Sequence, residues 1–238
     1  MKKSDENQVI NSIVELLNNI DYDLNFIYRG QSIDWPLIPS IARKSISEWG
    51  YETWYDLQDD LIRRFKKWSI PYVTQQPTNN VEWLVLAQHH GLPTSLLDWS
   101  TNCIKALFFS VEDESFDTQD GVLFAFDPTS WIYDISAHLK VTDREYPNNY
   151  EVFFPDAIDS RVVAQESCYT YYPMRNSKSR VKPLTEIKIF RNIKKLIIPA
   201  KAKRGCRIEL SRLGITHMSM FPGLEGVSRT IKLNEEIF

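Results

Sequence analysis

Apolar residues recur at helical spacing in three long stretches of the chain. Over residues 4–20 they fall every three or four positions, which predicts an amphipathic helix beginning near Ser4 or Asp5. Over residues 47–68 they occupy one helical face and charged residues the other, so the apolar face is predicted to pack into the core. A third helix is predicted over residues 81–90.

Shorter apolar runs predict the strands of a sheet. Residues 26–29 form one, and residues 121–128 contain a run that is apolar on both faces, as is typical of a central strand. Residues 94–99 fit a strand or an extended approach to a helix. Residues 161–172, dense in β-branched and aromatic residues, predict a strand, and residues 187–199 alternate well enough for one or two.

The order of these elements predicts the fold class. A further helix is expected over residues 201–214, and the basic stretch 175–182 is expected to be a loop. Strands and helices alternate irregularly and no stretch has the composition of a linker. We therefore expect a single mixed α+β domain, a central β-sheet flanked by helices, over residues 26–238, with an N-terminal helix packed on it within residues 1–25.

Composition narrows the class of protein. The 238 residues are 43% hydrophobic and carry a net charge of −3, so the chain can build a substantial core and its charge does not advertise a polyanion partner. Its three cysteines are widely spaced, which favours a reducing compartment, and we expect the cytoplasm. The N-terminal residues lack the apolar core of a signal peptide, and no apolar run approaches the roughly 20 residues of a membrane helix.

Arg29 follows an apolar strand, where a buried charge costs several kcal/mol unless it is paired. It therefore needs a partner. One interpretation is a salt bridge to Asp34 or Asp98. The other is a bidentate contact with a phosphate or carboxylate ligand, which Gly30 would allow to approach the backbone.

Polar residues also interrupt the helix that ends near residue 90. Gln88, His89 and His90 are consecutive, so their side chains point in different directions and at most two can line one pocket. Adjacent histidines are a poor metal pair on a helix, and no third ligand stands at a suitable local spacing. We expect no bound metal.

A carboxylate lies just before the next predicted helix. Asp98 is expected to cap that helix or to pair with Arg29. The helix is predicted to begin near Ser100 or Thr101, with one of the two as its cap, and these positions could equally face a phosphate through the free N–H groups of a helix N-terminus. The segments of Arg29 and Asp98 would then converge on one site.

Gln165 and Glu166 are candidates for a catalytic role. In a strand their side chains would point to opposite faces, so only one can face inward. An inward Glu166 could stabilise a cationic transition state, and an outward one would be solvated.

The chain resembles the bacterial FRG-domain family from about Phe26 to Gly226. The family takes its name from a Phe/Tyr-Arg-Gly sequence, met here as Tyr28, Arg29 and Gly30. The segments that carry the resemblance are "FIYRGQ", "PLIPSIAR", "WLVLAQHHGLPTSLLDWSTNCIKALFFSVED", "RVVAQESCYT" and "GITHMSMFPGLEG".

A weaker similarity links the order of these parts to ADP-ribosyltransferases of the Arg-Ser-Glu type. It implies that Arg29 holds the phosphates of NAD and that Ser100 or Thr94 supports the nicotinamide side. Glu166 or Gln165 would stabilise the oxocarbenium-like sugar. The binding residues expected around such a site are Tyr28, Arg29, Gly30, Gln31, Arg43, Gln88, His89, Thr94, Asp98 and Trp99.

The resemblance suggests an NAD-dependent enzyme that acts as a toxin or phage-defence effector on a protein or nucleic-acid acceptor. The alternative is a non-catalytic module that binds a nucleotide or nucleic acid through Arg29, Arg43 and the basic stretch 175–182. A third hypothesis is a metal-independent nuclease that uses His89 or His90 as its base.

Overall fold

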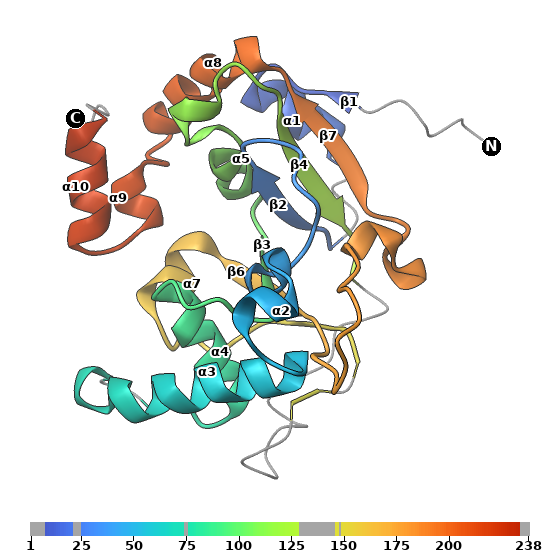
Figure 1. Ribbon diagram of the computed structural model, residues 1–238. Coiled ribbons are helices and arrows are strands. Elements are labelled where there is room, and N and C mark those ends of the chain that lie inside the picture. The colour runs from blue at the N-terminus through green and yellow to red at the C-terminus, as the bar shows by residue number, and fades with distance from the viewer. Residues whose placement is uncertain (1–7, 21–24, 74–75, 129–145, 148, 234–238) are drawn as a thin grey trace.

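A seven-stranded sheet is the centre of the described part of the chain (Figure 1). The computed structural model describes residues 8–20, 25–73, 76–128, 146–147 and 149–233. The strand order is β1-β7-β4-β2-β3-β6-β5, antiparallel except for the parallel pair β1 and β7. The strands are β1 (Gln8–Val9), β2 (Ile27–Gln31), β3 (Leu96–Ser100), β4 (Gly121–Phe126), β5 (Glu151–Phe153), β6 (Ser167–Tyr171) and β7 (Lys194–Ile198).

Helices surround both halves of this sheet. In Figure 1, α1, α5 and α8 lie beside the β2, β4 and β7 half, and α2, α3, α4 and α7 beside the β3 and β6 half. The α-helices are α1 (Ile13–Asn19), α2 (Ile46–Trp49), α3 (Trp54–Ser69), α4 (Asn80–His89), α5 (Cys103–Val111), α7 (Ser160–Gln165), α8 (Ala200–Arg212), α9 (His217–Met220) and α10 (Leu224–Lys232). Short 3₁₀ turns are η1 (Ser40–Arg43), η2 (Ile70–Tyr72), η3 (Glu114–Phe116), η4 (Leu184–Glu186) and η5 (Lys188–Phe190). The expected α+β class is confirmed.

The sheet has a seam between β2 and β3. All five residues of β2 pair with β4, whereas β2 meets β3 at the single pair Tyr28 and Ser100. Beyond that pair the strands separate, and the Arg29 side chain donates from Nη1 to the main-chain oxygen of Asp98 at 2.8 Å. A side-chain hydrogen bond thus takes the place of the next backbone contact.

Hydrophobic packing closes the seam on one face of the sheet and leaves it open on the other. One hydrophobic cluster runs across the seam and joins Ile27 of β2 to Leu97 and Trp99 of β3. On the opposite face Tyr28 belongs to a cluster under α5 and α8, and Leu96 to a separate cluster under α3 and α4. The two halves of the sheet therefore share one hydrophobic cluster on one face. On the other face a space remains between their two separate clusters.

Gly30 is required by helix packing. A Cβ built at Gly30 would lie 1.8 Å from the main-chain oxygen of Ala106 and 2.8 Å from the nitrogen of Ser110, both in α5. Real side chains never approach backbone so closely, so α5 can rest on β2 only where β2 has a glycine. Gly30 also lines the cavity described below, so the expectation that it lets a ligand approach the backbone stays a prediction.

Several helical predictions are confirmed and two need correction. The helix predicted over residues 81–90 is α4, and α8 matches the helix expected before Gly214. The stretch 47–68 divides into α2 and α3, because Gly50 ends α2 with φ at +75°. The predicted start of the first helix at Ser4 or Asp5 lies outside the described residues. Within them α1 begins only at Ile13, capped by the Ser12 side chain, after the short strand β1.

The segment 161–172 was predicted to be one strand and is not. Residues 160–165 form the helix α7, Glu166 follows with φ at +48°, and only then does β6 begin. The Asp159 side chain caps α7 by accepting from the nitrogen of Arg161. This cap is the local signal that outweighs the β-branched Val162 and Val163.

No helix among the described residues is long and apolar enough to cross a membrane.

Candidate functional site

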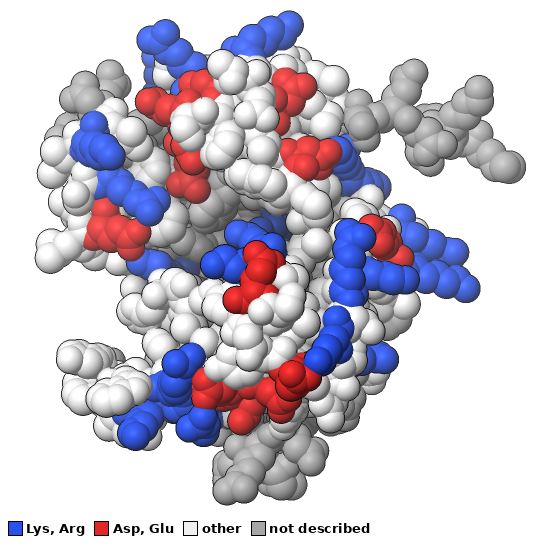
Figure 2. Space-filling model, viewed as in Figure 1, with Lys and Arg blue, Asp and Glu red and all other residues white. Residues whose placement is uncertain are grey.

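A cavity of about 260 Å³ lies at the seam, and we call it the Arg29 cavity. Figure 2 shows a hollow in this face of the molecule with Lys or Arg side chains inside it. The lining comes from β2, β3, α4, α5, α7 and the segment after α9. Its residues are Tyr28, Arg29, Gly30, Gln88, His89, Asp98, Trp99, Ser100, Ala106, Phe109, Arg161, Gln165 and Phe221.

Arg29 is largely enclosed and only partly neutralised. Its side chain is 13% exposed, and Nη1 lies 3.5 Å from Oδ2 of Asp98. Its Nε is buried without a hydrogen-bond partner among the described residues. Burial lowers the pKa of the guanidinium, and the Asp98 carboxylate opposes that shift. Asp98 is therefore the partner of Arg29, while Asp34, the other candidate, pairs with Lys195.

A chain of side-chain hydrogen bonds orients Asp98. Gln88 donates from Nε2 to Oδ1 of Asp98 at 2.5 Å, and the Thr94 hydroxyl donates to Oε1 of Gln88. The Thr94 oxygen also accepts from the nitrogen of Leu96 at 3.2 Å. Thr94 is fully buried, so it acts on Asp98 through Gln88 and does not line the Arg29 cavity.

A smaller cavity of about 160 Å³ adjoins the first, and Arg29, Gln88 and Asp98 line both. The Arg29–Asp98 pair thus forms a partition between two spaces. Arg43, at the end of η1, lines the smaller one and places a second guanidinium near the pair.

His89 and His90 face different cavities, as their adjacent positions predicted. The buried His89 lines the Arg29 cavity, with Nε2 2.9 Å from the hydroxyl of Tyr169. Its Nδ1 lies 3.6 Å from Oδ2 of Asp159. Burial raises the pKa of the Tyr169 hydroxyl well above its ordinary value, so this hydroxyl stays protonated, and the tautomer of His89 sets which of the two groups donates. His90 lines a separate groove.

Only one of Gln165 and Glu166 lines the cavity, but the two residues lie at the end of a helix and not in a strand. Gln165 lines the Arg29 cavity and donates from Nε2 to the main-chain oxygen of Met220 at 2.9 Å. Glu166 is exposed and pairs with Lys105 at 2.8 Å, outside the cavity lining. Burial would raise the pKa of Glu166, but hydrogen bonds from Lys105 and Asn102 leave it lowered. A free inward carboxylate at position 166 is therefore absent from this arrangement.

Ser100 lies in the cavity wall but does not cap α5. Its hydroxyl donates to the main-chain oxygen of Gln165 at 2.7 Å and accepts from the nitrogen of Asn102 at 3.0 Å. The cap is Asn102, whose side chain accepts from the nitrogens of Ile104 and Lys105. The predicted cap at Ser100 or Thr101 is wrong by one or two residues.

Most other expected binding residues also lie in the wall. Tyr28 and Trp99 line the Arg29 cavity from the strands on either side of the seam. Gln31 does not line it, because its side chain donates to the main-chain oxygen of Trp35 at 3.1 Å.

The sequence interpretation missed Ala106, Phe109, Arg161 and Phe221. Arg161 donates from Nη1 to the main-chain oxygen of His89 at 2.6 Å, and its guanidinium lies 5.6 Å from the centre of the Phe221 ring. A helix over residues 160–165 would have revealed Arg161, since it stands four positions before Gln165 on the same helical face. Phe221 lies too far along the chain for any local signal.

The residues that the structure describes contain no group of three or more His, Cys, Asp or Glu side chains arranged to hold a metal ion.

The fold and the cavity define a mixed α+β protein with an enclosed arginine at the seam of its sheet. Residues 24–119 match the FRG domain family, and the chain therefore contains an FRG domain. The matched range includes β2, α4, β3 and α5, whereas Arg161, Gln165 and Phe221 complete the cavity from outside it. Comparisons with curated proteins and with solved structures gave no match.

Proposed function

We propose that the Arg29 cavity binds a nucleotide, with NAD as the leading candidate and ADP-ribosyl transfer as its reaction. The observation that carries the proposal is Arg29 itself. Its guanidinium is enclosed in a cavity wall, and its buried Nε has no hydrogen-bond partner among the described residues. The Asp98 carboxylate holds it there and only partly neutralises its charge. A phosphate would supply the missing negative charge and hydrogen-bond acceptors.

The remaining lining supports a ligand with both rings and phosphates. Arg161 adds a second guanidinium, and Tyr28, Trp99, Phe109 and Phe221 offer ring surfaces. The cavity alone is smaller than the roughly 300–1,000 Å³ of ordinary ligand sites. A dinucleotide would therefore also need the adjoining cavity, where Arg43 stands beside the Arg29–Asp98 partition.

The transfer step needs a carboxylate near the ribosyl carbon as the bond to nicotinamide breaks. Glu166 is paired with Lys105 outside the cavity. Asp98 is the one carboxylate among the described residues that line the cavity, and its side chain is 49% exposed. We assign to Asp98, in place of Glu166, the role of the carboxylate that stabilises the ribosyl cation; below we call this the acid role.

The alternative is a module that binds a nucleotide without turning it over. Two observations favour this alternative. Glu166 lies outside the cavity, and Asp98 is already engaged by Arg29 and Gln88. The related hypothesis of nucleic-acid binding through residues 175–182 has less support, because none of these residues lines the Arg29 cavity.

The test is NAD binding and NAD consumption by the purified protein, compared with Arg29→Gln. Calorimetry with NAD and with ADP-ribose reports binding, and release of nicotinamide reports turnover. We expect Arg29→Gln to weaken binding by about tenfold or more, since a charge-assisted hydrogen bond to phosphate contributes about 1.5–3 kcal/mol.

Arg63→Gln is the matched control, because Arg63 is an arginine 68% exposed on α3 and lies outside both cavities. It should leave binding unchanged. Binding without nicotinamide release would favour the non-catalytic module. Absence of binding to either compound would reject the nucleotide site. NAD turnover in the cell would be consistent with the toxin or phage-defence role, which phage challenge of cells expressing the two variants would test.

A further inference from the structure

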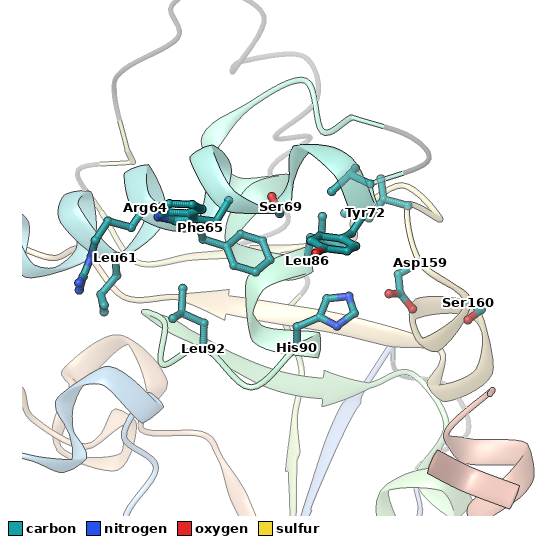
Figure 3. Close-up of a pocket in the computed structure, with 13 residues that line it drawn as sticks. Leu61, Arg64, Phe65, Ser69, Tyr72, Leu86, His90, Leu92, Asp159 and Ser160 are labelled. Carbon is teal, nitrogen blue, oxygen red and sulfur yellow. The ribbon is translucent and has the colours of Figure 1, made fainter. Parts of the chain in front are cut away.

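A second and larger cavity, of about 770 Å³, lies on the far side of α4, and we call it the α3 groove. Its volume falls within the range of small-molecule sites. Figure 3 shows the residues that line it. They are Leu61, Arg64, Phe65, Trp68, Ser69, Tyr72, Val73, Leu86, His90, Leu92, Ile158, Asp159 and Ser160.

The α3 groove is distinct from the Arg29 cavity, since no residue that the structure describes lines both. His89 and Asp159 stand between them, 3.6 Å apart, with His89 facing the first cavity and Asp159 the groove. The groove is therefore not part of the proposed nucleotide site.

Aromatic side chains are unusually exposed along this groove. Trp68 is 71% exposed and Tyr72 is 85% exposed, although each would gain by burial against a partner. The half-buried Phe65 lies between Arg64 and Ser69 in the wall (Figure 3). Aromatic faces of this kind stabilise apolar bodies and also cations through the ring quadrupole.

Polar groups are separated along the groove. Arg64 lies at one end and Asp159 at the other, with His90 near Asp159 (Figure 3). Arg64 is already paired with Asp60 at 3.0 Å and is 56% exposed, so it offers little to a ligand. The apolar Leu86 and Leu92 lie between the two ends.

Asp159 places a carboxylate in the wall of the groove. Its Oδ1 accepts from the nitrogen of Arg161 at 2.7 Å, and its Oδ2 lies 3.6 Å from Nδ1 of His89. The pKa of Asp159 is lowered to about 2, chiefly by the interaction with His89 and then by the Arg161 nitrogen. The carboxylate is thus ionised at neutral pH in a wall where its side chain is only 17% exposed.

We infer that the α3 groove is a second binding site, for a small organic cation with an apolar or aromatic body and an ammonium group. The body would lie against Phe65, Trp68 and Tyr72, and the ammonium would face Asp159. This inference does not rest on the proposed nucleotide site.

The test compares two probes that share one body. We expect 2-naphthylmethylammonium to bind more tightly than neutral 2-naphthylmethanol, by about tenfold, the equivalent of 1.4 kcal/mol for a partly enclosed charge pair. Calorimetry at pH 8 measures both dissociation constants. Asp159→Asn, which retains a capping side chain, should abolish the difference between the probes.

Asp113→Asn is the matched control, since Asp113 caps η3, does not line the groove and should preserve the difference. Trp68→Ala, at an exposed position that tolerates truncation, should weaken both probes by about fivefold. Equal binding of the probes, no binding of either, or a difference that survives Asp159→Asn would overturn the inference. Preference for 2-naphthylacetate would do so too, because it would assign the groove to anions.

Discussion

The Arg29 guanidinium donates to the main-chain oxygen of Asp98 at 2.8 Å and lies 3.5 Å from the carboxylate of the same residue. One side chain of β2 therefore joins the two halves of the sheet where their backbones separate. Because the shorter contact is to the backbone, it survives any substitution of the Asp98 side chain. The arginine that defines the candidate site is also part of the structure that forms it.

We predict unequal stability losses when the two partners are changed. Asp98→Asn removes a half-exposed carboxylate and should lower the free energy of unfolding by about 1 kcal/mol. Arg29→Gln also removes the bond to the main-chain oxygen of Asp98 and should cost about 2–3 kcal/mol. Urea unfolding of both variants measures the difference. Equal losses would show that the backbone contact contributes nothing.

Gly30→Ala should destabilise the protein severely. The added carbon would collide with the main-chain oxygen of Ala106, so α5 must move away from β2 at a cost of about 3 kcal/mol or more. Gly205→Ala is the opposite control, because Gly205 stands in α8 with open space around it. That change should raise the free energy of unfolding by about 0.5–1 kcal/mol. Similar unfolding midpoints for the two variants would contradict the close packing of α5.

The helix cap after β3 gives a third prediction. Asn102→Ala should lower the free energy of unfolding by about 1 kcal/mol, because the Asn102 side chain satisfies two nitrogens at the start of α5. Thr101→Ala, at an exposed neighbouring position, should change it by less than about 0.5 kcal/mol. A larger loss of stability in Thr101→Ala than in Asn102→Ala, measured by chemical denaturation, would show that Thr101 caps α5, as one of the sequence predictions had it.

The acid side of the stability curve should depend on Asp159. Its pKa falls from an ordinary 3.8 to about 2 in the folded protein. A lowered folded pKa means that the contribution is complete above about pH 4 and is lost as pH falls toward 2. At pH 7 the free energy of unfolding of the wild type should exceed that of Asp159→Asn by about 1 kcal/mol, since solvent screening reduces the full value of the shift. This gap should narrow in urea unfolding at pH 3, and a constant gap would contradict the shift.

The sequence predicted much of the fold because its strongest signals are local. The apolar run at residues 121–126 and the periodicity of residues 81–90 specify β4 and α4 without reference to the rest of the chain. Because a buried charge requires a partner, the sequence limited the candidates for Arg29 to Asp34 and Asp98, and the structure selects Asp98.

One missed part of the site depends on contacts between distant segments, and another on a local helix cap. Phe221 reaches the Arg29 cavity through the packing of α9, which no spacing in the sequence encodes. Val162 and Val163 favoured a strand, but the Asp159 cap and the turn at Glu166 make α7. That single difference left open which of Gln165 and Glu166 faces the cavity, and it concealed Arg161.

Two variants can show whether Asp98 or Glu166 is the carboxylate that acts on the substrate. If the cavity transfers ADP-ribose, Asp98→Asn should lower the rate of nicotinamide release by about 100-fold, as for other groups that stabilise a transition-state charge. Glu166→Gln should leave the rate within about twofold, because its carboxylate is paired with Lys105 outside the cavity. Lys105→Met removes the same ion pair and keeps the carboxylate, so it is the matched control. Loss of turnover in Glu166→Gln but not in Lys105→Met would mean that Glu166 acts on the substrate, and the acid role of Asp98 would be wrong.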